Sequence, residues 1–61
     1  MNFNILIVMN DNKEYRLEGL NERETQRTLA NAYDDILALR QKVRFGDLEV
    51  EALDLQYFCV E

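Results

Sequence analysis

Cys59 is the only cysteine in this chain of 61 residues, which contains no histidine. An internal disulfide is therefore impossible, and a structural zinc site is excluded because it needs several thiolate or imidazole ligands. The length suits one small domain, residues 1–61, which buries only about 60 % of its unfolded surface. Because such a small core contributes little stability, self-association is the remaining common way to stabilise the fold.

The composition also limits the chemistry that the chain can perform. It lacks serine, histidine, proline and tryptophan, so neither a Ser-His nor a Cys-His dyad can form. We therefore expect a non-enzymatic binding protein with no catalytic residues, no metal site and no cofactor.

The longest apolar run, Ile5–Met9, is too short to span a membrane and lacks the flanks of a signal peptide. A lone cysteine without an export signal is typical of a reducing compartment. We therefore expect a cytoplasmic protein that does not bind membranes.

The first twenty residues have the pattern of a β-hairpin. Apolar residues alternate over residues 3–9 and again, more weakly, over residues 14–18. The segment Asn10–Asn12 between them favours a turn, because Asn and Asp tolerate left-handed backbone and bond their own main chain.

A long helix is predicted to follow the hairpin. Asn21 and Glu24 have the spacing of a capping box, in which each side chain bonds the backbone N–H of the other. Helical spacing of apolar residues then predicts a helix to about Arg44, with Gly46 as its C-cap. The predicted apolar stripe comprises Leu29, Ala32 or Tyr33, Ile36, Leu39 and Val43.

Residues 53–60 alternate as a third strand, although the spacing of Leu48, Ala52 and Leu55 would also suit a short helix. A strand there would return antiparallel to the first strand and place that strand in the centre of the sheet. We therefore predict an α+β fold with the order ββαβ, in which one long helix packs on one face of a three-stranded antiparallel or mixed sheet.

Both faces of the predicted sheet are apolar. The odd-numbered residues of Phe3–Met9 would pack under the helix, while the other face would carry Leu6 and Val8 with Phe58 and Val60 beside them. One helix covers one face only, and a bare apolar patch is unusual on a monomer. We expect a homodimer closed through this second face or through an edge strand. Scattered surface apolar residues are the alternative.

The net charge of −5 is unevenly distributed. All seven basic residues lie in residues 1–44 with seven acidic ones, whereas residues 45–61, the acidic tail, hold five acidic residues and no base. Direct binding to nucleic acid is disfavoured because it needs a cationic surface, and a cationic protein partner is favoured. Ordinary solubility is the alternative explanation.

Two acids of the tail, Glu49 and Glu51, would point the same way in an extended segment, about 6.7 Å apart. Asp47 continues the row and Asp54 lies just beyond it. Carboxylates at this pitch are similar in scale to the charges along one strand of nucleic acid, as a protein that occupies a DNA-binding groove would need. Solvent-facing alternation produces the same pattern.

Three further features have simpler explanations. Asp34 and Asp35 are expected on a solvated helix face without a basic partner, because adjacent helical residues point about 100° apart. Cys59 is expected to be a small core residue of an apolar strand. The segment Asn10–Glu14 lacks the Gly and the distal Glu of a calcium loop and favours a turn.

The segment Gly19–Arg40, GLNERETQRTLANAYDDILALR, resembles the helix region of the very short uracil-DNA glycosylase inhibitors of Bacillus phages. The residues that match the family's pattern are Gly19, Leu20, Asn31, Asp34, Ile36, Leu39 and Arg40, with Asp35 and Leu37 as conservative matches. The preceding hairpin is similar in kind, so the resemblance covers about two-thirds of the chain.

This resemblance implies a dimeric DNA mimic that blocks the glycosylase, in the host cytoplasm if a phage encodes it. The enzyme flips uracil out of the duplex and wedges an apolar side chain into it, and the inhibitors offer that wedge an apolar pocket. The family's two helix aromatics fall on Thr25 and Leu29 here, and its strand Glu falls on Tyr15. We therefore expect Leu29 and Tyr33, with Tyr15 beside them, to line an equivalent pocket.

The charges and the resemblance together predict a set of partner-binding residues. They are Tyr15, Glu18, Glu22, Leu29, Tyr33, Glu49, Glu51 and Asp54. The acids would face a basic DNA cleft, and the apolar residues would receive the wedge. Two alternatives remain open: a phage anti-defence protein that blocks another basic DNA-binding enzyme, such as a CRISPR nuclease, or a small dimeric regulatory adaptor. An adaptor would bind with little salt dependence, whereas a mimic would weaken steeply as salt rises.

Overall fold

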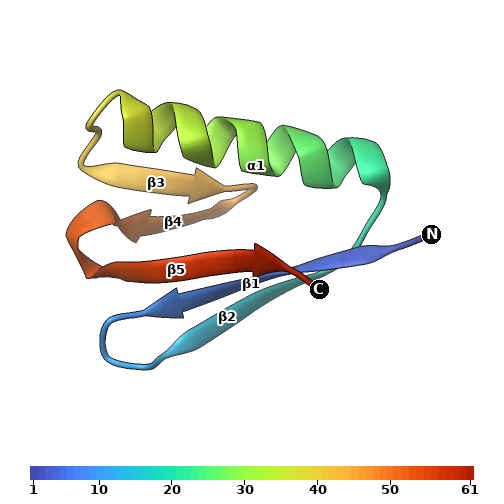
Figure 1. Cartoon of the computed structure of the whole chain (residues 1–61), viewed down its shortest axis with the longest axis horizontal. Helices are drawn as coiled ribbons and strands as arrows, with labels where there is room; N and C mark the ends of the chain where they lie inside the picture. The colour runs from blue at the N-terminus through green and yellow to red at the C-terminus, as the bar shows by residue number, and fades with distance from the viewer.

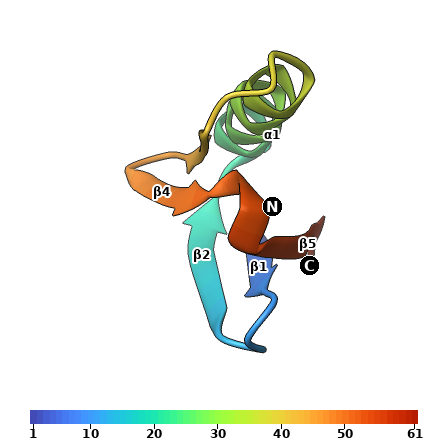
Figure 2. The same ribbon diagram turned by 90° about the vertical axis from the view of Figure 1, so that its left-hand side faces the viewer.

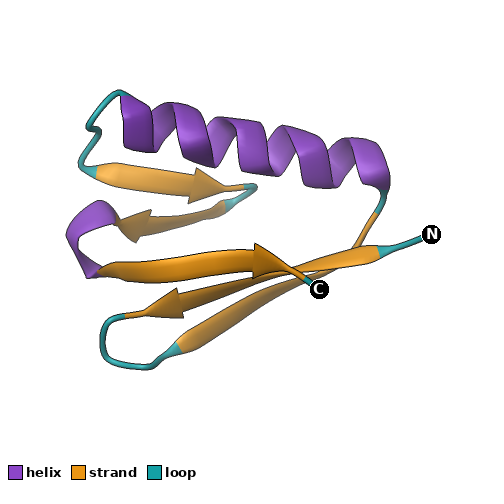
Figure 3. Ribbon diagram, in the orientation of Figure 1, coloured by secondary structure: helices purple, strands orange, loops and turns teal.

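The computed structural model describes all 61 residues. The elements are β1 (Phe3–Met9), β2 (Glu14–Leu20), α1 (Glu22–Leu37), β3 (Lys42–Phe45), β4 (Leu48–Glu51), the 3₁₀ turn η1 (Ala52–Asp54) and β5 (Leu55–Val60). They form an antiparallel three-stranded sheet in the order β2-β1-β5 and a separate β3-β4 hairpin (Figures 1 and 3). The predicted α+β fold, with the first strand central and one helix on the sheet, is confirmed, but the β3-β4 hairpin was not predicted.

Local chemistry explains the first hairpin. Asn12 has the left-handed φ of 70°, and the N–H of Lys13 donates to Asp11 Oδ1 at 2.9 Å. Gly19, also at φ 70°, lies where the register of β1 and β2 shifts, and its N–H donates to Asn4 Oδ1 at 3.1 Å. The bulge therefore uses the residue type that tolerates this backbone conformation.

The start of α1 is also as predicted. The backbone N–H of Glu24 donates to Asn21 Oδ1 at 2.8 Å, and the N–H of Asn21 donates to Glu24 Oε1 at 3.0 Å. This capping box satisfies two backbone donors at the end of the helix.

The helix ends at Leu37, seven residues before the predicted end. The N–H of Leu39 donates to Ile36 O at 3.1 Å, and the N–H of Arg40 donates to Asp35 O at 3.0 Å. This pair of bonds is a Schellman motif, which usually places glycine at the left-handed position. Here Leu39 occupies that position, with a φ of 55°.

The residues expected to complete the helix form β3 instead. Val43 and Phe45 are fully buried while their neighbours are exposed, which is the alternation of a strand. Gly46, with a φ of 66°, and Asp47 form the two-residue turn to β4, so the prediction that Gly46 caps the helix was wrong. The four-residue spacing of Leu39 and Val43 fits a helix locally, but Val43 pairs with Val50 in the β3-β4 hairpin.

Only part of the apolar stripe predicted for α1 is buried: Ala32 belongs to the core and Leu29 packs against it. The buried helix residues are Thr25, Thr28, Ala32 and Asp35, and α1 packs mainly against β3. Tyr33 and Ile36, by contrast, are 53 % and 36 % exposed. Small and short polar side chains therefore let the helix approach β3 closely, and part of the apolar stripe stays accessible.

The core lies where the helix, the small hairpin and the three-stranded sheet meet. Figure 2 shows α1, the small hairpin and the three-stranded sheet arranged around one centre, with no ribbon segment between α1 and β5. The core side chains are Ile5, Ile7, Met9, Ala32, Val43, Phe45 and Val50.

The register of β5 corrects the predicted second face of the sheet. Phe58 pairs with Ile7 and Val60 pairs with Ile5, so both lie on the core side rather than beside Leu6. Cys59 pairs with Leu6 on the outer face and is exposed, so its predicted place in the core was wrong.

The outer face of the sheet is not a bare apolar patch. Arg16 Nε lies 2.8 Å from Glu61 Oε1 and thus joins β2 to the end of β5 across the central strand. This hydrogen-bonded carboxylate raises the pKa of Arg16. Leu6 is half-buried, and Val8 is 4 % exposed. The predicted apolar surface for a dimer is therefore absent from this face.

No helix in the structure has the length and apolar character needed to cross a membrane.

Candidate binding groove

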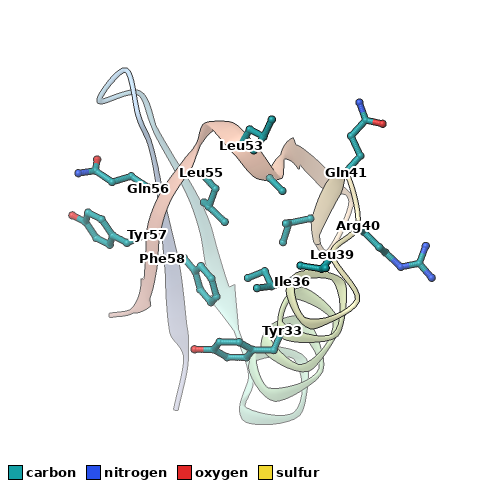
Figure 4. Close-up of a pocket in the computed structure, with 12 residues that line it drawn as sticks. Tyr33, Ile36, Leu39, Arg40, Gln41, Leu53, Leu55, Gln56, Tyr57 and Phe58 are labelled. Carbon is teal, nitrogen blue, oxygen red and sulfur yellow. The ribbon is translucent and has the colours of Figure 1, made fainter.

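An apolar groove occupies the open side of the core, between α1 and β5, and has a volume of ≈ 650 Å³ (Figure 4). Its lining residues are Tyr33, Ile36, Leu39, Arg40, Gln41, Val43, Ala52, Leu53, Leu55, Gln56, Tyr57 and Phe58. Nine of these twelve are hydrophobic, so the groove suits an apolar occupant better than a charged one.

Aromatic packing holds the bottom of the groove together. The ring of Phe58 lies 5.0 Å from that of Phe45 in an edge arrangement, and 5.3 Å from that of Tyr33. These are ordinary separations for stabilising aromatic pairs. In Figure 4, Leu55 and Phe58 point from β5 toward the helix, and Ile36 points back toward them. The packed rings therefore give the groove a fixed base.

The rim of the groove exposes large apolar side chains. Leu39 is 91 % exposed and Leu53 is 92 % exposed. Leu39 also has a left-handed backbone that favours glycine, and this conformation costs about 1 kcal/mol for a leucine. The helix end therefore holds a large exposed apolar side chain at the rim, at a position where glycine is usual.

A charged cluster fixes the helix against β3 behind the groove. Asp35 is 1 % exposed and accepts from the backbone N–H, Nε and Nη2 of Arg44 at 3.0, 2.9 and 3.0 Å. Arg40 Nε lies 3.4 Å from the same carboxylate. The prediction of a solvated Asp35 without a basic partner was therefore wrong.

The hydrogen bonds from Arg44 lower the pKa of Asp35 and outweigh the opposing effect of burial. The same carboxylate raises the pKa of Arg44. Because every buried side-chain oxygen and nitrogen has a partner, the cluster has no unsatisfied group to offer a ligand. Its role is to hold β3 and the end of α1 together.

The structure separates the three apolar residues predicted to form a pocket. Tyr33 lines the groove, but Leu29 is half-buried and packs against the core. Tyr15 lines a different hollow at the β1-β2 turn, together with Lys13 and Asp54. Tyr33 is therefore the one member of this predicted set that reaches the groove.

The predicted acids are all exposed, but they are not gathered at the groove. Glu49 and Glu51 lie on the exposed side of β4, directly opposite Arg44 and Lys42 of β3. Neither residue lines the groove, although Glu51 directly precedes the lining residue Ala52. Asp54 directly follows the rim residue Leu53.

Glu18 and Glu22 lie on either side of the connection from β2 to α1, at the N-terminal end of the helix. They too are exposed and lie outside the groove lining. The acids therefore surround the molecule rather than form one continuous row.

Sequence reasoning placed several groove residues in secondary structure but did not predict that they line one groove. Ile36 and Leu39 were assigned to the buried helix face, and Leu53, Leu55 and Phe58 to a third strand. The discriminating signal was Gly46-Asp47 between two alternating segments, which predicts a hairpin that replaces the helix end as the packing partner.

Comparison of the chain with protein-family models, curated proteins and solved structures finds no match. No group of three or more His, Cys, Asp or Glu side chains is arranged to hold a metal ion.

Proposed function

We propose that this chain is a non-enzymatic cytoplasmic inhibitor that binds a DNA-processing enzyme, with uracil-DNA glycosylase as the target. The observation that carries the proposal is the α1-β5 groove, whose accessible lining is mainly hydrophobic. An apolar side chain that the enzyme normally inserts into duplex DNA would enter this groove. No direct contact with nucleic acid or membrane is required.

The groove has the properties of a binding centre rather than of a catalytic one. Its polar groups are the side chains of Arg40, Gln41 and Gln56 and the hydroxyls of two tyrosines, and the lining holds no His, Lys, Asp, Glu, Ser or Cys to activate them. Burial of Tyr33, Ile36 and Leu53 against a partner would slow dissociation, because desolvated central contacts carry most of the binding energy.

Charge would act on association rather than on the stability of the complex. The net charge of −5 favours the approach of a basic DNA-binding surface. Because Arg44 and Lys42 face Glu49 and Glu51 across the hairpin, that acidic pair supplies less attraction than an unopposed row. Glu18, Glu22 and Asp54 have no ion-pair partner in the structure and would contribute more of the steering.

The test is a cleavage assay with bacterial uracil-DNA glycosylase and a uracil-containing oligonucleotide. We expect the purified protein to suppress cleavage, and Tyr33→Ala or Ile36→Ala to weaken inhibition by about tenfold or more. Leu37→Ala is the matched control, because Leu37 lies on the same helix, is 80 % exposed and does not line the groove. Unhindered cleavage at a large molar excess of folded protein would disprove the proposed target.

Salt dependence separates the proposed mimic from a regulatory adaptor. Inhibition by a mimic should weaken steeply between about 50 and 200 mM salt, because counterions compete for the basic cleft. An adaptor that binds only through the apolar groove should lose little affinity over the same range. The basic residues opposite Glu49 and Glu51 favour the adaptor alternative, because they reduce the attraction of this acidic pair for a basic cleft.

A further inference from the structure

A second hollow, the β2-α1 hollow, lies between strand β2, the first half of α1 and the β3-β4 turn, and has a volume of ≈ 640 Å³. Its lining residues are Leu17, Leu20, Glu24, Arg27, Thr28, Gly46, Asp47 and Leu48. None of these residues lines the α1-β5 groove. The volume is within the range of small-molecule sites, about 300–1,000 Å³.

The side chain of Thr28 is more than nine-tenths buried and yet has no hydrogen-bond partner. Thr28 is 8 % exposed, and none of the side-chain hydrogen bonds of the structure involves it. Because every fully buried side-chain oxygen has a partner, the hydroxyl of Thr28 must be reached from the hollow that it lines. It therefore offers a ligand one donor and one acceptor.

Charges of both signs line the same hollow without pairing. Arg27 supplies a guanidinium, and Glu24 and Asp47 supply carboxylates. The ion pairs of the structure involve none of these three residues. Glu24 Oε1 accepts from the backbone N–H of Asn21 at 3.0 Å, whereas Oε2 makes no hydrogen bond. The hollow therefore offers an anion and a cation one partner each.

Three leucines form the apolar wall of the hollow. Leu17 and Leu20 come from β2, and Leu48 comes from β4. All three are half-buried and pack against the core, which holds them in place. Fixed apolar walls with a few polar groups are the usual composition of a small-molecule site.

We propose that the β2-α1 hollow binds a free α-amino acid with a large apolar side chain, such as leucine. The ligand's carboxylate pairs with Arg27 and accepts a hydrogen bond from Thr28, and its ammonium pairs with Asp47. Its side chain packs against the three leucines of the wall.

A zwitterion fits these charges better than a ligand with one charge. A simple amine would leave Arg27 without a partner, and a simple carboxylate would leave Asp47 without one. A peptide carries its ammonium and its carboxylate at opposite ends, so it brings only one of them to the hollow. This inference does not depend on the proposed function, because the hollow and the groove share no lining residue.

Titration of the isotope-labelled protein with leucine, followed by NMR, tests both binding and its location. We expect saturable shifts of the backbone amides of Thr28, Gly46 and Leu48, and none at Tyr33 or Phe58 of the groove. The absence of saturation at about 50 mM leucine, or shifts confined to the groove, would overturn the proposal.

Three analogues test which parts of the ligand are recognised. Leucinamide lacks the carboxylate, N-acetylleucine lacks the ammonium, and glycine lacks the apolar side chain. Each should bind about tenfold or more weakly than leucine, because each leaves one group of the hollow without a partner. An analogue that binds as tightly as leucine would refute the role assigned to the group that it lacks.

Substitutions in the hollow give the matching test on the protein. Arg27→Gln, Asp47→Asn and the isosteric Thr28→Val should each weaken leucine binding, the first two by about tenfold. Arg23→Gln is the matched control, because Arg23 is exposed on the same helix and does not line the hollow.

Unchanged binding by Arg27→Gln and Asp47→Asn would overturn the proposal. These two exposed positions decide if Thr28→Val fails to fold. Leucine binding by a protein that leaves glycosylase cleavage unhindered would reject only the proposed function, and inhibition without leucine binding would reject only this inference.

Discussion

The side chain of Asp35 caps the edge of β3 by accepting three hydrogen bonds from Arg44, one of them from the backbone N–H at 3.0 Å. A strand edge that would otherwise be unpaired is thus satisfied by a helix side chain. The 1 % exposure of Asp35 makes the pair a tertiary contact rather than a surface ion pair.

Replacement of this carboxylate should destabilise the fold strongly. Asp35→Asn removes the negative charge from a 1 % exposed position and puts an NH₂ donor where one carboxylate oxygen accepted a hydrogen bond from Arg44, so a buried group is left unsatisfied. Urea unfolding should show a lower midpoint than for the wild type. Asp34→Asn is the matched control on the adjacent, exposed residue and should change the midpoint little. An equal effect of the two variants would contradict the role assigned to Asp35.

The same pair predicts how stability depends on pH. Arg44 lowers the pKa of Asp35 below its ordinary 3.8 in the folded state. The stabilisation is therefore fully present above pH 3.8 and is lost as the pH falls from there through the folded pKa, because the unfolded state binds the proton first. The difference in unfolding free energy between wild type and Asp35→Asn should narrow over this acid range. A difference that stays constant would show that the protonation of Asp35 is not coupled to the stability of the fold.

The capping box predicts a smaller and purely local effect. Asn21→Ala removes the acceptor at 2.8 Å from the N–H of Glu24 and should cost about 1 kcal/mol of unfolding free energy. Glu24→Ala removes the reciprocal bond, and the double variant should lose less than the sum because the two bonds form one motif. Arg23→Ala, between them and exposed, is the control. Strictly additive losses would show that the two bonds act independently.

Local signals were sufficient for the first hairpin and for the start of the helix. The left-handed turn at Asn12 and the reciprocal bonds of Asn21 and Glu24 involve residues close in sequence. The sequence therefore predicts these elements and the central position of β1. The end of the helix could not be predicted from local signals. It depends on the contact of Asp35 with Arg44, and Arg44 lies on β3, which forms only by pairing with β4.

The groove was also less predictable, because it is formed by residues that lie far apart in the sequence. Tyr33 was recognised as a candidate, but its neighbour Phe58 comes from a strand 25 positions later whose register decides which face the ring takes. Alternation alone places Phe58 on either face, since a shift of one residue reverses every side chain. The acids Glu49 and Glu51 were correctly placed on one side of a strand, but the basic residues opposite them follow only from the pairing with β3.

The backbone of Leu39 predicts opposite effects on stability and on binding. Leu39→Gly relieves a leucine held at a φ of 55° and should raise the unfolding free energy by about 1 kcal/mol. It also removes a 91 % exposed apolar side chain from the groove rim and should weaken inhibition of the glycosylase. Leu39→Ala is the matched control, because it removes the same side chain while keeping a residue with a Cβ at the left-handed position. It should weaken inhibition equally without the gain in stability, as measured by urea unfolding and the cleavage assay. If Leu39→Gly stabilises the protein and inhibits as well as the wild type, the rim leucine has no part in binding.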